Sequence, residues 1–397
     1  MQNASDRINR LSESQTIAMA KRGRELQAEG KDIISLSLGE PDFHTPDRIK
    51  QAAKKAIDDN FTSYTPVSGY LELREAISKK FKRDNNLDYS ANQIVTSTGA
   101  KQSIANVVLS IVNPGDEVIL PTPYWVSYVE IIKMAEGIPV FVDATIESDF
   151  KITAEQLKSA ITEKTKMMIF SSPCNPTGSI YGKAELEALA NVISTKKDLY
   201  VIADEIYEHI NFGGKHESLA QFSSVYDQVI TINGVSKGFA MTGWRLGYIG
   251  APEWIAKACD KIQGQFTSAT CSITQRAVIE AMDMDPSETY HMRDAFKERR
   301  DYVISRLQKM DGVIINKPEG AFYVFPNIGQ LLGRKHSKGK IETATDLCLY
   351  LLEFAEVALV TGEAFGSPEC IRISYATSLT VLEDAMNRIE KALNQLH

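Results

Sequence analysis

The sequence lacks several features that would assign it to whole classes of protein. No apolar run approaches the ~20 residues needed to span a bilayer, and the N-terminus has no apolar segment of the kind found in signal peptides. The five cysteines are scattered and include no C-x-x-C pair, and the six histidines show no metal-ligand spacing. We therefore expect free thiols in a reducing compartment, a cytoplasmic location, no membrane contact and no metal.

Positive charge is also scarce. The 44 Lys and Arg residues are outnumbered by 51 Asp and Glu, and the formal net charge of −7 argues against nucleic acid or an anionic membrane as partner. No G-x-G-x-x-G fingerprint follows an early strand, which disfavours a nicotinamide dehydrogenase. What remains is an ordinary globular composition, 43% apolar and 24% charged, and 397 residues are enough for about two to three domains.

The middle of the chain alternates short apolar runs with helical patterns. Continuous apolar runs are typical of parallel strands covered on both faces, and the repeated crossovers predict one doubly wound domain at 46–289. The expected strands are 93–98, 117–120, 138–142, 166–170, 199–204, 228–232 and 246–250, and the expected helices are 46–59, 71–83, 99–112 and 183–194.

The pattern changes after Pro286. We expect helices at 291–310, 343–354 and 379–396, strands at 312–316, 320–325 and 370–375, and one more helix at 14–29. Residues 1–45 and 290–397 are predicted to form a second, smaller α+β domain from both termini. The predicted fold class is therefore α/β, with a doubly wound, mostly parallel sheet and a smaller α+β domain.

The chain is organised around the stretch from Thr231 to Arg245. An apolar strand stops at Asn233-Gly234, and Lys237 follows at the carboxyl edge of the predicted sheet, where open α/β sheets bind their ligands. Lys237 could be a surface cation. It could also be an amine of lowered pKa, ready to form a Schiff base with an aldehyde.

Four other residues each have a structural and a chemical interpretation. Asp204 ends an apolar strand, where an unpaired carboxylate is costly; it could cap a helix, pair within the fold or face a protonated ring nitrogen. Arg245 and Arg372 could be surface ions or two-pronged anion clamps. Gly99, at a strand-to-helix turn, frees backbone N–H groups for an anion such as phosphate, although most such turns bind nothing.

Further candidates are weaker when taken singly. Asn175 begins an Asn-Pro-Thr-Gly sequence that is either a turn or a source of an amide donor. Trp125 and Tyr128 are more often core residues than stacking platforms, and Cys174 is interpreted as a small filler. Gly39 marks either a plain turn or a close approach of the backbone to another group.

Together these residues form an ordered set of motifs: Gly39-Glu-Pro-Asp, Tyr64, Gly99-Ala-Lys101, Pro123-Tyr-Trp125, Asn175-Pro-Thr-Gly, Asp204-Glu-Ile-Tyr207, Ser236-Lys237, Gly243-Trp-Arg245 and Arg372. In this order the chain resembles the class I, fold-type I, pyridoxal-phosphate-dependent aminotransferases, in their bacterial aspartate aminotransferase subgroup. The resemblance covers nearly all of residues 5–397. The joint set is specific, although no single motif is.

The resemblance implies pyridoxal 5'-phosphate as the cofactor. Lys237 would be the catalytic residue: its amine would tether the cofactor aldehyde and, once freed, move a proton between the substrate Cα and the cofactor. Asp204 would pair with the protonated ring nitrogen, and Tyr207 and Asn175 would hydrogen-bond the ring oxygen. Trp125 would stack on the ring face.

The resemblance also implies a phosphate site, formed by Gly99, Ala100, Lys101, Ser236 and Arg245. Many relatives carry a serine three residues before the lysine; this chain has Gly234 there, so Ser236 would supply the hydroxyl. Tyr64 would reach the phosphate in a neighbouring subunit, which implies a homodimer.

The substrates implied are amino acids and 2-oxo acids, bound by Gly39, Trp125, Asn175, Arg372, Lys101 and Thr16. Arg372 would grip the α-carboxylate, and Lys101 and Thr16 the distal carboxylate. Some relatives that also accept prephenate carry a lysine near position 12, where this chain has Ser12. We expect an aspartate aminotransferase that passes the amino group of L-aspartate to 2-oxoglutarate. The alternatives are an aromatic, prephenate or other broad-specificity class I aminotransferase, a C–S lyase, and a binding protein with an inactive site.

Overall fold

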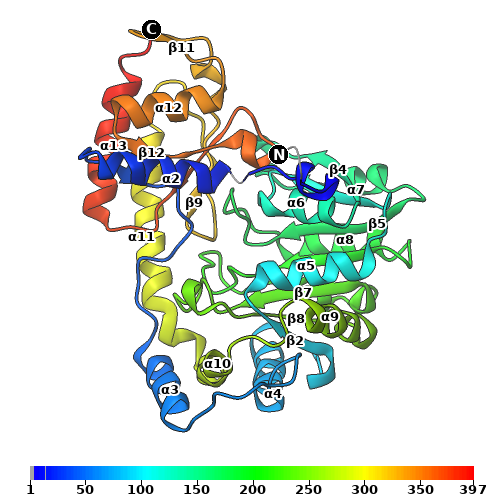
Figure 1. Cartoon of the computed structure of the whole chain (residues 1–397). Helices are drawn as coiled ribbons and strands as arrows, with labels where there is room; N and C mark the ends of the chain where they lie inside the picture. Colours follow the sequence, from blue (N-terminus) through cyan, green and yellow to red (C-terminus); the bar gives the residue numbers. More distant parts are fainter. Residues whose placement is uncertain (1–3, 14) are drawn as a thin grey trace.

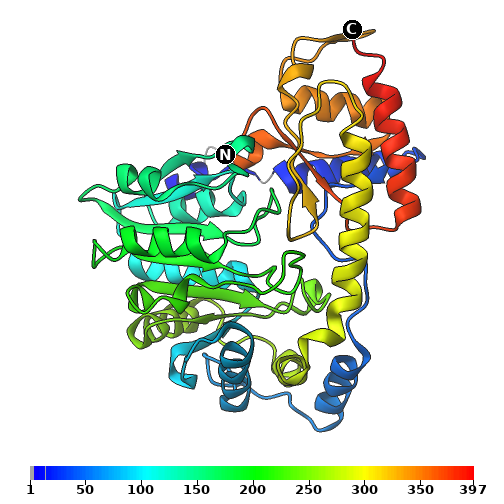
Figure 2. The same ribbon diagram turned by 180° about the vertical axis from the view of Figure 1, so that it is seen from behind.

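The structure, a computed structural model, describes residues 4–13 and 15–397, except for the side chains of residues 15–17 and 20. The described chain forms a large lobe on a central sheet and a smaller lobe made from both ends of the chain (Figure 1). The long helix α11 (Tyr290–Leu307) runs beside both lobes, as the view from behind also shows (Figure 2). Within the described ranges, no helix is both long enough and apolar enough to cross a membrane.

Seven strands of the described chain form the central sheet, in the order β2-β8-β7-β6-β5-β3-β4. β8 is antiparallel to both of its neighbours, and the remaining pairs are parallel. Their bounds are β2 (Ile94–Ser97), β3 (Glu117–Thr122), β4 (Ile138–Asp143), β5 (Thr165–Ser171), β6 (Tyr200–Asp204), β7 (Val229–Gly234) and β8 (Gly247–Gly250). Each expected strand of this region is present, and the predicted α/β class with a mostly parallel sheet is confirmed.

Helices cover both faces of this sheet, each face over its own hydrophobic core. One core lies under α5 (Ala100–Ile111), α6 (Ser127–Met134) and α9 (Glu253–Phe266). The other lies under α3 (Asp47–Asp58), α4 (Leu71–Lys80), α7 (Ala154–Ala160), α8 (Lys183–Ile193) and α10 (Ser272–Asp283). The helix expected at 71–83 ends at Lys80 and continues as a π-helical turn, Phe81–Asn85. The sequence analysis named no helix at the positions of α6, α7, α9 and α10.

The small lobe is built around a third core. It contains α11, α12 (Ala344–Phe354), α13 (Leu379–Leu393) and a three-stranded antiparallel sheet in the order β13-β14-β9, with bounds Val360–Thr361, Ile371–Ser374 and Tyr323–Val324. From the N-terminal end come α2 (Gln15–Ala28) and β1 (Ile34–Ser35), which pairs with β12 (Val357–Ala358). The short helix α1 (Asp6–Asn9) instead lies beside α6 of the large lobe, where Arg10 pairs with Glu136 at 3.0 Å (Figure 1). A short hairpin joins β10 (Lys335–His336) and β11 (Gly339–Lys340).

Two strand predictions in the small lobe need correction. The strand expected at 312–316 is absent from the described structure, where this segment makes one isolated bridge from Ile314 to Asn327. Ile314 is 44% exposed, so the apolar residue that suggested a buried strand instead lies at the surface. The strand expected at 320–325 shortens to β9.

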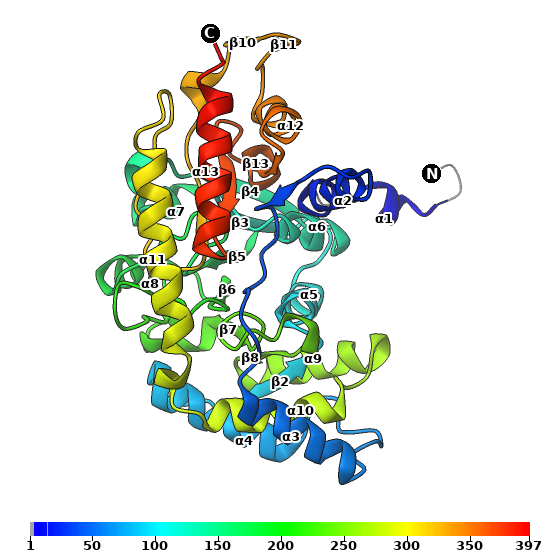
Figure 3. The same cartoon turned by 90° about the vertical axis from the view of Figure 1, so that its left-hand side faces the viewer.

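The two lobes are connected by α11 and by an extended segment between β1 and α3. Figure 3 shows this segment running down the side of the molecule from the small lobe to the bottom of the large one. It brings Gly39 and Glu40 to the junction, where they meet the carboxyl ends of the central strands. The division into a domain at 46–289 and a domain formed by 1–45 and 290–397 remains our prediction.

Candidate active site

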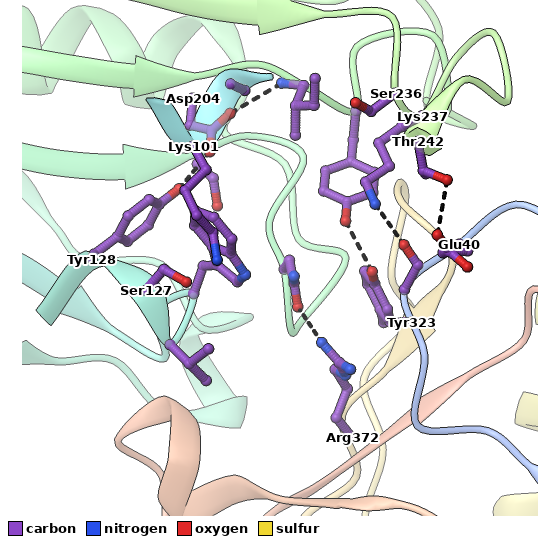
Figure 4. Close-up of a pocket in the computed structure, with 18 of the residues that line it drawn as sticks. Glu40, Lys101, Ser127, Tyr128, Asp204, Ser236, Lys237, Thr242, Tyr323 and Arg372 are labelled. Carbon is purple, nitrogen blue, oxygen red and sulfur yellow. Dashed lines mark hydrogen bonds between the residues drawn. The ribbon is translucent and has the colours of Figure 1, made fainter. Parts of the chain in front are cut away.

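A cavity of about 580 Å³ lies where the carboxyl ends of β5, β6 and β7 face the small lobe. In Figure 4, Lys237 points into it from the large lobe and Arg372 from the small lobe. Most of the predicted site residues line this cavity: Gly39, Ala100, Lys101, Trp125, Asn175, Asp204, Tyr207, Ser236, Lys237, Arg245 and Arg372.

Lys237 is held by the loop that follows β7. Its Nζ donates a hydrogen bond to the Gly39 carbonyl at 2.5 Å and lies 5.8 Å from the centre of the Tyr207 ring. Burial lowers the pKa of Lys237 to about 8, against the opposing effect of Glu40. Because this pKa lies close to neutrality, an appreciable share of the amine is unprotonated and nucleophilic under ordinary conditions.

Asp204 ends β6 and is 5% exposed. Its carboxylate accepts hydrogen bonds from the Tyr128 hydroxyl at 2.7 Å and from the Ile206 backbone at 3.3 Å. Burial raises the pKa of Asp204 to about 6, and no ion pair among the described residues includes this carboxylate. A buried acid without a cation is costly, so the arrangement fits a positively charged ligand group at this position.

Arg372 presents the complementary feature. It lies on β14, is 2% exposed, and donates to the Asn175 side-chain oxygen at 2.9 Å and to the Ser37 carbonyl at 2.6 Å. Its Nε has no hydrogen-bond partner in the described structure. The guanidinium is therefore a buried cation at the wall of the cavity, without a carboxylate partner among the described residues, which is the arrangement expected for binding a carboxylate.

The third feature is an anion-binding corner at the start of α5. Gly99 has a φ of 85°, and a Cβ at this residue would overlap the Arg245 guanidinium. Arg245 itself has a φ of 53° and donates to the Thr242 carbonyl at 2.9 Å. The first N–H groups of a helix lack partners within the helix, so Ala100 and Lys101 bring donors and positive dipole to the same corner.

The aromatic residues of the site lie beside these charges. Trp125 is half-buried against Tyr128, with ring centres 5.4 Å apart at 84°, and Lys101 Nζ lies 4.9 Å from the centre of the Trp125 ring. The Tyr207 hydroxyl is 2.9 Å from that of Tyr323. Burial raises the pKa of Tyr207 well above its usual value. Tyr207 is thus a neutral hydrogen-bonding group.

Two predicted residues of the described chain are not among those that line the cavity. Tyr64 is fully exposed on a loop of the large lobe, at 101% of its reference area. Gly99 lies next to the lining residue Ala100. The predicted Thr16 side chain lies outside the described residues. Ser236 is buried at the cavity wall, as expected for a residue of the lysine loop.

Several lining residues were not predicted from the sequence, among them Glu40, Thr242 and Tyr323. The Thr242 hydroxyl donates to Glu40 at 2.8 Å, which joins the extended segment to the lysine loop. Glu40 and Thr242 both lie within motifs already singled out. Tyr323 has only the local signal of a short apolar run, Gly320 to Phe325, which does not identify the residue facing the site.

With this geometry in view, comparison with known proteins identifies the family. A family model described as aminotransferase class I and II matches residues 31–389. The chain belongs to this aminotransferase family.

The aminotransferase resembles its relatives over its whole length. It is 47% identical to a probable aspartate/prephenate aminotransferase of Rhizobium leguminosarum bv. phaseoli, with 97% of each chain covered. It is 45% identical to a bifunctional aspartate aminotransferase and glutamate/aspartate-prephenate aminotransferase of Petunia hybrida, with 98% of this chain and 82% of the other covered.

Solved structures agree. The crystal structure of the aspartate aminotransferase from Rhizobium meliloti matches with a TM-score of 0.97 at 41% identity, over the whole of both chains. That of the aspartate aminotransferase from Thermus thermophilus with maleate matches with a TM-score of 0.93 at 37% identity, over 99% of this chain and 100% of the other. The resemblance stated from the motifs is confirmed.

Proposed function

We propose that this aminotransferase is an aspartate aminotransferase that moves the amino group of L-aspartate to 2-oxoglutarate, giving oxaloacetate and L-glutamate by a ping-pong mechanism. One observation carries the proposal: a lysine amine of lowered pKa shares a cavity with a buried carboxylate without a cation and a buried guanidinium without an anion. The names of the relatives support the choice of substrates.

Pyridoxal phosphate, which the family implies, fits the residues present. Asp204 would hold a proton at the ring nitrogen, Tyr207 and the free amide of Asn175 would hydrogen-bond the ring oxygen, and Trp125 would cover one face. The phosphate would be held by the anion-binding corner, formed by Gly99, Ala100, Lys101, Ser236 and Arg245. When bound, the cofactor supplies an electron sink for the bond broken at the substrate Cα.

Lys237 would both tether the cofactor and, once released, move the proton at the substrate Cα. Its pKa of about 8 suits this task, because general acid–base catalysis is most effective when the pKa lies near the working pH. In this structure the free amine donates to the Gly39 carbonyl.

Arg372 would bind the α-carboxylate of either substrate as a fork, with Asn175 holding the guanidinium in place. The distal carboxylate of aspartate or 2-oxoglutarate would meet Lys101 and Thr16. Support for a dicarboxylate comes from the Thermus thermophilus relative, whose structure was determined with maleate.

A second candidate activity is supported by the names of the relatives. Those from Rhizobium leguminosarum and Petunia hybrida include prephenate. By the resemblance, some prephenate-accepting relatives carry a lysine near the position of Ser12, whose backbone N–H donates to Glu130 at 2.8 Å in this chain. We therefore rank aspartate and glutamate above prephenate.

The test is a panel of amino donors with 2-oxoglutarate: aspartate, phenylalanine, kynurenine and arogenate. We expect aspartate to give the highest kcat/KM. A preference for an aromatic donor, or for arogenate, would overturn the assignment to aspartate. Borohydride reduction followed by peptide mapping should locate the cofactor on Lys237, and K237A should abolish turnover.

We also propose a homodimer in a cytoplasmic setting. Tyr64 is fully exposed in the single chain and would reach the cofactor phosphate of a partner subunit. The five cysteines are free in the structure, in agreement with a reducing compartment. Light scattering tests whether the protein is a dimer. Y64F should weaken cofactor binding while the protein stays dimeric.

A further inference from the structure

Tyr323 lies where the two lobes meet. It comes from β9 of the small lobe, whereas Tyr207 follows β6 of the large lobe, and their hydroxyl oxygens are 2.9 Å apart. Both side chains are buried, and the two rings meet at 78° with centres 5.9 Å apart. The contact is therefore fixed by packing as well as by the hydrogen bond, which Figure 4 shows as a dashed line.

The same ring also supports Arg372. The guanidinium carbon lies 4.6 Å from the centre of the Tyr323 ring, within the range of a cation–π contact. The backbone fixes this pairing, because β9 and β14 are antiparallel neighbours with Tyr323 opposite Ser374. One tyrosine thus contacts both the proposed carboxylate clamp and the tyrosine proposed to face the cofactor.

The extended segment between the lobes is also fitted to this hydroxyl. A Cβ on Gly39 would overlap the Tyr323 oxygen, so only glycine allows the segment to pass here. The Gly39 carbonyl in turn accepts the hydrogen bond from Lys237. The Tyr323 hydroxyl therefore lies next to Tyr207 and to Gly39, the hydrogen-bond partner of Lys237. It is not itself one of the proposed catalytic groups.

We propose that Tyr323 is a positioning residue: its hydroxyl holds the Tyr207 hydroxyl toward the cofactor, while its ring face holds Arg372 for the substrate carboxylate. When Tyr323 donates to Tyr207, the proton of Tyr207 is free for the ring oxygen of the cofactor. The hydroxyl and the ring have separate tasks, so they can be separated by substitution. This inference rests on the proposed function.

The test compares Y323F, Y323L and Y207F holoenzymes. Y323F keeps the ring and loses the hydroxyl. We expect its kcat to fall about 3- to 10-fold, and the pH midpoint of its visible cofactor absorption to rise by about half a unit to one unit. Its affinity for maleate, measured by calorimetry, should stay within about twofold of the wild type. Y323L, which loses both, should in addition bind maleate about 3- to 30-fold more weakly.

A double variant shows whether Tyr323 acts through Tyr207. If it does, Y207F/Y323F should have the same absorption midpoint as Y207F alone. The matched control is Y350F, which removes a buried hydroxyl hydrogen bond of 2.8 Å to Ala392 within the small lobe and should leave the midpoint unchanged.

Three results would overturn the inference: an unchanged midpoint in Y323F, additive midpoints in the double variant, or an equal shift in Y350F. Failure of the proposed function looks different. In that case the wild-type protein itself would lack the cofactor absorption band or transaminase activity.

Discussion

Replacing Arg372 tests the proposed carboxylate clamp most directly. R372K keeps a positive charge but replaces a planar fork with a single ammonium, and R372L removes the charge altogether. In the structure the guanidinium donates to the Asn175 side-chain oxygen and to the Ser37 carbonyl, and its Nε has no partner among the described residues. The two substitutions therefore separate the contribution of geometry from that of charge.

The expected magnitudes follow from these contacts. A hydrogen bond to a charged group contributes about 1.5–3 kcal/mol, so losing one prong in R372K should lower kcat/KM for aspartate about 10- to 150-fold. R372L leaves the substrate carboxylate in a buried site without a cation. The corresponding loss is about 2–5 kcal/mol, or about 30- to 4,000-fold.

The assay is steady-state kinetics of aspartate with 2-oxoglutarate, together with thermal unfolding of each variant. R372L should lose only the stability contributed by the hydrogen bonds to Asn175 and Ser37, because no buried carboxylate loses its partner in this variant. The matched control is R306K, which alters an ion pair to Glu390 of 2.7 Å on α11 and should leave kcat/KM unchanged. If R372K retains kcat/KM within about threefold of the wild type, the carboxylate does not bind here as a fork.

Three further predictions follow from the same structure. Burial raises the pKa of Asp204 from 3.8 to about 6, so its ionisation destabilises the cofactor-free protein by about 3 kcal/mol above pH 6. Cofactor-free D204N should therefore melt at a higher temperature than the wild type at pH 8. The same variant should bind the cofactor more weakly. G99A should lower cofactor affinity at least about tenfold, whereas G115A, with a similar φ of 86° and no neighbouring atom within 4 Å, should only lose about 1 kcal/mol of stability. Burial lowers the pKa of His216, but Glu205 at 2.9 Å raises it more, to a value above 6.5, so the stability that the imidazolium contributes is full below pH 6.5 and is lost as pH rises through the folded-state pKa. Urea unfolding of H216Q should therefore differ most from the wild type below pH 6.5 and converge with it at higher pH; a constant difference would contradict this.

The central sheet could be predicted because its strands are buried on both faces. β6, for example, is a continuous apolar run that ends in Asp204, and neither pairing nor register is needed to recognise it. The strands of the small lobe were harder to predict, because they are two to four residues long and are held by the surrounding helices. α6 and α7, at eight and seven residues, complete only about two turns, too few for a period to show. α9 does carry a readable period, in Ile255, Cys259 and Gln263.

The candidate site likewise contains residues whose positions the sequence predicts and residues whose positions it does not. Asp204 and Lys237 could be placed together because parallel strands bring their carboxyl ends to one edge. Arg372 lies on another lobe, and only the family resemblance suggested that it shares the cavity. No local pattern identifies Tyr323, whose importance depends on the distance between two hydroxyls that are 116 residues apart in the chain.

Asp204 and Arg372, the buried acid and the buried cation of the cavity, do not pair with each other because each is held by other groups. Asp204 is fixed by Tyr128 and the end of β6, within the large lobe. Arg372 is held by Ser37, by the Tyr323 ring and, from the large lobe, by Asn175. Were the two to pair, the protein would gain stability and lose both binding positions. The carboxylate and the guanidinium instead keep their desolvation cost until ligands arrive. By the proposed function these ligands bind in turn. The cofactor brings a basic ring to Asp204 and is tethered by Lys237, and the amino acid then brings a carboxylate to Arg372.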